Sequence, residues 1–155
     1  MNPMTMRALS LAVVVAAWTA ISEMARVPLS LWPAIVALGC SLAAGGGIPG
    51  LQRTLAGTIS GVVWVLVAHA VSRALGGQDL VQALVAGAAA FGMVLQARVP
   101  LLSYTAGAFA GAGVAMGLRA VSVQGGVRVA IALAVGAVLG VAAERIPSLV
   151  ASRRL

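Results

Sequence analysis

The sequence predicts an all-α membrane protein with six transmembrane helices arranged as two inverted three-helix repeats. Three observations predict this fold class: the hydropathy of the whole chain, the spacing of its charged residues and an internal repeat. Of the 155 residues, 61% are hydrophobic and 8% are charged, and the mean hydropathy is +1.07. Soluble domains carry roughly a quarter charged residues. A water-soluble globule is therefore excluded, and residues 1–155 are expected to form a single transmembrane domain.

The positive charge of the chain also fits a membrane protein. The net charge of +7 comes from ten arginines, which are scattered along the chain rather than gathered in a cluster. Nucleic-acid binders cluster such charges on one exposed face, whereas these arginines separate apolar runs, as the flanks of membrane helices do. We therefore exclude nucleic acid as a partner and expect the arginines to contact lipid headgroups of the bilayer.

Six apolar segments are long enough, or nearly so, to cross a bilayer. At 1.5 Å per residue, a segment of about 18 residues reaches roughly 27 Å, which is at the short end for a bilayer core. The expected spans are 8–24, 29–44, 54–72, 80–97, 101–118 and 127–144.

The ends of these segments carry recognisable signals. The segment 8–24 follows Arg7 and has the apolar character of a signal peptide, but no cleavage site leads from it into a polar chain, so we interpret it as the first membrane helix. The second and fifth segments begin next to Pro28 and Pro100, and proline fits the first turn of a helix. The glycine-rich stretch 45–50 before the third segment is either a turn or a broken element that lines a cavity.

Glycine spacing indicates close helix packing. Gly-x-x-x-Gly patterns begin at Gly57, Gly107 and Gly136 in the third, fifth and sixth segments. Small residues at this spacing let helix backbones approach each other in lipid. They predict a tight bundle, a homo-oligomer interface, or both.

An internal repeat relates the two halves. The pentapeptide Ala-Arg-Val-Pro-Leu occurs at 25–29 and again at 97–101, an offset of 72 residues. When 8–74 is placed on 80–146 at this offset, about a quarter of the positions are identical, against about a tenth expected from composition. Each half holds three segments, so the second half enters the bilayer from the opposite face, the pattern of inverted-repeat transporters.

The composition argues against an enzyme. The acids Glu23, Asp79 and Glu144 are not paired at helical spacing, and the single histidine, His69, and single cysteine, Cys40, supply neither a nucleophilic triad nor a metal-ligand set. We expect no catalytic residue, no cofactor and no metal.

Polar residues within apolar segments are the main clue to function, because they are costly in hydrocarbon and tend to face a pathway. His69 is the only deep ionisable residue, and it lies either at headgroup level or facing a pore. Trp32 and Tyr104 coincide at the repeat offset and act either as interfacial anchors or as two constrictions of a pore. Ser30 and Ser103 offer uncharged hydroxyls beside them, which either bond to their own backbone or contact a solute.

Four stretches of the chain resemble a known family. The residues 46–51, 60–64, 91–98 and 101–112 are similar to the YcdZ-like family of small bacterial inner-membrane proteins. The most specific part is Leu-Leu-Ser-Tyr at 101–104, followed by a glycine and a second aromatic residue. The resemblance implies a bundle of several helices in the bacterial inner membrane. The family is a domain of unknown function, so it implies no activity and no functional residues.

Orientation and function complete the prediction. With six spans, six arginines lie on one side and four on the other, which places both termini in the cytoplasm. The scarcity of buried charge argues against a coupled cation antiporter. We therefore predict a homo-oligomeric channel or transporter-like path for a small neutral or weakly polar solute. The alternative is a structural or accessory subunit of a larger membrane complex, with no transport of its own.

Overall fold

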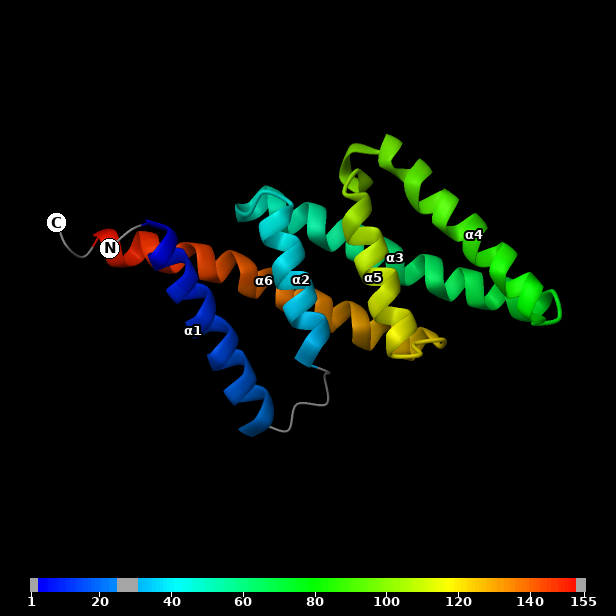
Figure 1. Cartoon of the computed structure of the whole chain (residues 1–155), viewed down its shortest axis with the longest axis horizontal. Coiled ribbons are helices and arrows are strands. Elements are labelled where there is room, and N and C mark those ends of the chain that lie inside the picture. Colours follow the sequence, from blue (N-terminus) through cyan, green and yellow to red (C-terminus); the bar gives the residue numbers. More distant parts are fainter. Residues whose placement is uncertain (1–2, 25–30, 153–155) are drawn as a thin grey trace.

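The computed structural model describes residues 3–24 and 31–152, and in these residues all regular secondary structure is helical (Figure 1). In chain order, the elements are α1 (Pro3–Met24), α2 (Leu31–Ala43), α3 (Gly47–Ala74), α4 (Asp79–Leu95), the 3-10 turns η1 (Gln96–Arg98) and η2 (Pro100–Leu102), α5 (Thr105–Gly117) and α6 (Val123–Ser152). The all-α prediction is therefore confirmed.

The helices differ in their capacity to cross a membrane. Three are long and apolar enough to span, namely α3, α4 continued to Arg98, and α6 as far as Ile146. The apolar parts of α1, α2 and α5 are shorter. The 13 residues of α2 and of α5 give about 20 Å at 1.5 Å per residue, less than the roughly 30 Å of a bilayer core. The chain is thus a membrane protein with three helices of spanning length, and the prediction of six full spans is confirmed for these three alone.

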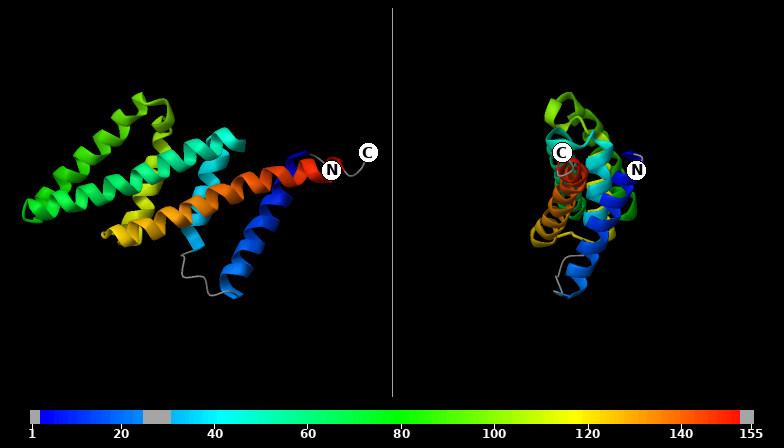
Figure 2. Two further views of the ribbon diagram at one scale, coloured as in Figure 1. Left: turned by 180° about the vertical axis from the view of Figure 1, so that it is seen from behind. Right: turned by 90° about the vertical axis from the view of Figure 1, so that its left-hand side faces the viewer.

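The two longest helices, α3 and α6, pack against each other at the centre and run in opposite directions (Figures 1 and 2). Each carries one of the short helices, because α5 packs on α3 and α2 packs on α6. The outer helices follow the same scheme, since α4 packs on α3 and α1 on α6. Most contacts therefore cross between the first three and the last three helices.

Glycines allow the short helices to touch the long ones directly. A Cβ on Gly61 of α3 would collide with the carbonyl oxygen of Ala108 in α5, and a Cβ on Gly136 of α6 would collide with that of Ala34 in α2. Without those Cβ atoms the backbones lie in contact, as small-residue packing in membranes allows. The glycine patterns thus serve packing within the chain, which confirms the tight bundle; self-association stays a prediction.

Both short helices end in the same hydrogen-bond pattern. After α2, the N–H of Gly46 donates to the carbonyl of Ser41 at 3.0 Å; after α5, the N–H of Ala120 donates to that of Ala115 at 2.9 Å. The residues before the two donors, Gly45 and Arg119, both have positive φ angles, 104° and 50°. This is the left-handed residue that commonly ends a helix.

Candidate functional site

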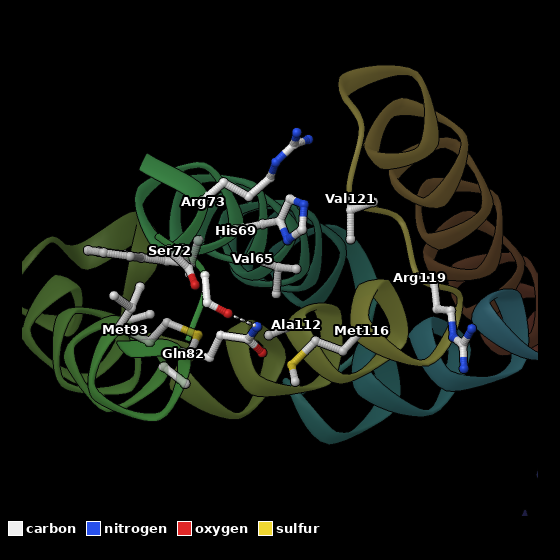
Figure 3. A pocket seen from close by; sticks show the side chains of 16 residues that line it. Val65, His69, Ser72, Arg73, Gln82, Met93, Ala112, Met116, Arg119 and Val121 are labelled. Carbon is white, nitrogen blue, oxygen red and sulfur yellow. Dashed lines mark hydrogen bonds between the residues drawn. The ribbon is translucent and has the colours of Figure 1, made fainter. Parts of the chain in front are cut away.

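A cavity of about 350 Å³ lies between α3, α4, α5 and the turn that follows α5 (Figure 3). Its volume is typical of small-ligand pockets, which combine apolar walls with a few placed polar groups. Its apolar wall includes Trp64, Val65, Val85, Met93 and Met116. Its polar residues are His69, Ser72, Arg73, Gln82 and Arg119.

Helix α4 lines the cavity with one face. The residues Gln82, Val85, Ala86, Ala89 and Met93 all contribute to the wall, and their spacing places them on the same side of a helix. In Figure 1, α3 and α4 are joined at one end and diverge from there, while α5 lies across their open end. The cavity lies among these three helices.

A chain of hydrogen bonds holds the far end of α4 to α3. The indole N–H of Trp64 donates to Oε1 of Gln96 at 2.9 Å, and Nε2 of Gln96 donates to Oγ of Ser60 at 3.0 Å. The Ser60 hydroxyl donates in turn to the carbonyl of Gly57 at 2.7 Å. The Trp64 ring occupies the space that a Cβ on Gly92 would fill. The ring thereby forms the apolar end of the cavity and fixes α4 at that point.

The opposite end of the cavity is polar and carries positive charge. Ser72 is 6% exposed, and no described residue forms a hydrogen bond with its hydroxyl, which faces the cavity (Figure 3). His69 is half-buried on the preceding turn of α3, and Arg73 and Arg119 are exposed at the rim. None of the described residues that line the cavity is acidic. The two arginines give the described lining a positive formal charge, which favours an anionic group over a cationic one.

Of the five residues that the sequence singles out, four are described by the structure, and of these four His69 alone lines this cavity. Ser103 is exposed, and its hydroxyl donates to the carbonyl of Pro100 at 2.8 Å, a local backbone bond. Ser30 lies outside the described residues. The pore role of all these residues stays a prediction.

The two predicted aromatic constrictions lie at opposite ends of the α2–α5 pair. Trp32 begins α2 and is 41% exposed, and its ring carbons come within 3.4–3.5 Å of the Cβ position of Gly117 at the end of α5. Tyr104 precedes α5; its ring covers Gly107, and its side chain lies beside that of Cys40 in the last part of α2. Each aromatic residue thus joins the start of one short helix to the end of the other.

The carboxylate of Glu144, in α6, lies against the turn before α3. Oε2 of Glu144 in α6 accepts a hydrogen bond from the N–H of Gly47 at 2.5 Å, and the carboxyl group fills the space over Gly46. The first N–H groups of a helix have no partner within the helix, and its N-terminal end carries partial positive charge. Glu144 therefore neutralises the start of α3 from a position 97 residues away in the sequence.

The comparisons with known proteins concern the whole chain. A family model described as "Protein of unknown function (DUF1097)" matches residues 8–148, a range that contains every residue of the cavity. No curated protein and no solved structure matches the chain. Because the family model covers most of its length, the chain belongs to the DUF1097 family, whose function is not established.

Proposed function

We propose that this protein is a channel or transporter-like path for a small neutral or weakly polar solute, and that the solute occupies the cavity between α3, α4 and α5. The cavity itself carries this proposal, since it combines an apolar wall with one polar end. Such a lining suits a solute with an apolar body and a single polar group. Location in the bacterial inner membrane, cytoplasmic termini, self-association and the absence of enzymatic activity belong to the same proposal.

The proposal includes two inverted repeats, of which α1 to α3 form one and α4 to α6 the other. Three exchanged packing relationships support it. The first helix of each half packs on the third helix of the other half: α1 on α6, and α4 on α3. The second helix of each half does the same: α2 on α6, and α5 on α3. The two third helices, α3 and α6, pack on each other. In Figure 1 a half-turn in the plane of the view brings each helix near the direction and place of its counterpart. Transporters built this way place their solute sites where the repeats meet.

Equivalent atoms support the same relationship in detail. The hydrogen bonds that end α2 and α5 have acceptors in Ser41 and Ala115, which are 74 positions apart. The glycine contacts correspond as well, because Gly61 contacts Ala108 and Gly136 contacts Ala34. The two glycines are 75 positions apart, and the two alanines are 74 positions apart. These offsets exceed the 72 of the pentapeptide, so the proposed repeats carry a short insertion between that motif and the second helix.

The test is solute flux in liposomes that contain the purified protein. Stopped-flow light scattering reports swelling or shrinkage with urea, glycerol, ammonia and small organic acids. Ala86 and Ala88 are both exposed on α4, but only Ala86 lines the cavity. Ala86→Phe is expected to lower the flux of the transported solute about tenfold, because the ring fills the path. Ala88→Phe is the matched control and is expected to leave flux unchanged.

Two results would contradict the proposal. Wild-type liposomes that behave like empty vesicles with every solute would favour the accessory-subunit alternative. Equal flux in wild type and Ala86→Phe would place the path elsewhere in the molecule.

A further inference from the structure

We propose that the cavity binds a short organic acid as its anion, with the carboxylate near Ser72 and His69 and the apolar body against Trp64 and Met93. This inference rests on the proposed function and names the class of its solute. It differs from the neutral or weakly polar solute expected from the sequence in one respect, because the polar group of the bound solute is a charged carboxylate.

The hydroxyl of Ser72, which faces the cavity, is the first argument. The residue as a whole is 6% exposed, and among the described residues its hydroxyl has no hydrogen-bond partner, so it is free to donate to a solute in the cavity. Two other hydroxyls of α3 bond to their own helix: Thr58 donates to the carbonyl of Thr54 at 2.8 Å, and Ser60 donates to that of Gly57 at 2.7 Å. A hydroxyl that opens into a largely apolar cavity gains free energy when it finds a hydrogen-bond partner there. A solute that accepts a hydrogen bond from Ser72 supplies this partner.

The charge of the lining is the second argument, because it selects among acceptors. The described lining holds Arg73 and Arg119 at the rim, an imidazole at His69 and no carboxylate. An anionic acceptor gains from this surplus of positive charge, and a neutral one does not. The apolar wall at Trp64 and Met93 then requires that the anion carry an apolar body.

The proposed repeat supplies the third argument. His69 lies eight residues after Gly61, and Glu144 lies eight residues after Gly136, the corresponding contact glycine. The two side chains therefore occupy equivalent places in the two halves. Glu144 puts a carboxylate beside the turn after α2, whereas the equivalent place beside the turn after α5 holds an imidazole and an open cavity. We infer that the solute places a carboxylate beside His69, where it corresponds to the Glu144 carboxylate of the other half.

The direct test compares two probes of nearly the same size. Benzoate and benzamide differ in charge but not in shape, and their binding to the full-length protein in phosphatidylcholine nanodiscs is measured by isothermal titration calorimetry. We expect benzoate to bind at least about tenfold more tightly than benzamide, the difference expected of a charge-assisted hydrogen bond. Equal affinities would overturn the assignment of an acid while leaving the path itself in place. No binding of either probe, together with flux that is insensitive to Ala86→Phe, would overturn both proposals.

A carboxylate on an apolar body reaches the cavity either from water or from the bilayer, as a fatty acid. Repeating the benzoate titration in nanodiscs that contain oleate separates the two sources. Benzoate binding that is unchanged by oleate identifies a water-borne acid. Loss of benzoate binding in the presence of oleate identifies a fatty acid, and both results support the carboxylate site.

Two substitutions test the position of the carboxylate. His69→Glu introduces the residue type that Glu144 has in the other half. The new carboxylate is expected to weaken benzoate binding at least about tenfold, because it repels the benzoate carboxylate and occupies its place. His69→Gln is the matched control of similar size, and it is expected to retain most of the binding. Ser72→Ala is expected to weaken benzoate binding about tenfold. Benzoate affinity that matches wild type in both His69→Glu and Ser72→Ala would overturn the proposal.

Discussion

At the scale of single residues, the Glu144 carboxylate and the Gly47 amide show why local sequence says little about the polar groups of this chain. The two groups are 97 residues apart and belong to different halves, yet they form one hydrogen bond of 2.5 Å. Gly46 leaves room for the carboxylate because it has no side chain. The pairing depends on the packing of α6 against α3, so no motif within either segment reveals it.

Glu144→Gln is expected to destabilise the protein by about 1–2 kcal/mol, because the amide keeps an acceptor but loses the charge that favours a helix N-terminus. The measurement is the unfolding midpoint in a titration with a denaturing detergent. Glu23→Gln is the control, since Glu23 is exposed near the end of α1. A shift of the same size in both variants would show that the charge of Glu144 makes no specific contribution.

The pair Trp64 and Gln96 yields a second residue-scale prediction. Gln96→Leu removes the acceptor of the indole N–H and the donor to Ser60. Leaving buried polar groups unpaired costs about 1–3 kcal/mol. In a double-mutant cycle with Trp64→Phe, we expect the two losses to be less than additive by about 1 kcal/mol, because both variants break the same hydrogen bond. Strict additivity would contradict a shared bond.

At the scale of elements, hydropathy located all six helices but misplaced several of their ends. The third segment was predicted to begin at residue 54, whereas α3 begins at Gly47, because the polar residues Gln52 and Arg53 continue the helix. The fifth was predicted to begin at 101, whereas α5 begins at Thr105 after two 3-10 turns. Hydropathy marks the apolar part of a segment, and helix ends depend on hydrogen bonding instead. At Val99 the following proline disfavours the helical region, and its backbone is extended.

Glycine at the helix crossings yields an element-scale prediction. Gly61→Ala places a Cβ against the carbonyl of Ala108 and is expected to destabilise the protein by about 2–3 kcal/mol through overpacking. Gly113→Ala is the matched control in α5, because nothing lies within 4 Å of its Cβ position. The control is expected to change stability by no more than about 1 kcal/mol, in the favourable direction. Similar unfolding midpoints for the two variants would argue against a direct contact between the backbones of α3 and α5.

At the scale of the whole molecule, the proposed inversion predicts which turns share a side of the membrane. In a background of Cys40→Ser, single cysteines at Gln78, Ser103 and Ser122 mark the connections between α3 and α4, α4 and α5, and α5 and α6. With cytoplasmic termini and six crossings, Gln78→Cys and Ser122→Cys are expected to react with an impermeant maleimide in intact cells. Ser103→Cys is expected to react only after the membrane is permeabilised. Labelling of all three from one side would contradict the six-crossing arrangement.

The cavity could not be predicted from the sequence, although one of the residues that line it was singled out there. His69 stood out because an ionisable residue in an apolar segment is rare. Trp64, Ser72 and Met93 look like ordinary members of membrane helices, and they form one site only because α3, α4 and α5 meet around it. The stretches 60–64 and 91–98 carry the family resemblance and also hold the hydrogen-bonded group of Trp64, Gln96 and Ser60. The family resemblance of these two stretches was therefore the feature of the sequence that could have pointed to this end of the cavity.

The dependence of the early helices on α6 has a consequence for biosynthesis. Because α6 is made last and packs on α1, α2 and α3, a nascent chain emerging from the ribosome cannot complete its first half until synthesis is almost finished. A polypeptide released before Gly136 has been added lacks both Gly136 and Glu144, so it leaves the α2 glycine contact unmade and the amide of Gly47 uncovered. Such a fragment is expected to remain with the insertion machinery and to be degraded by membrane proteases, whereas loss of residues after 148 spares both contacts.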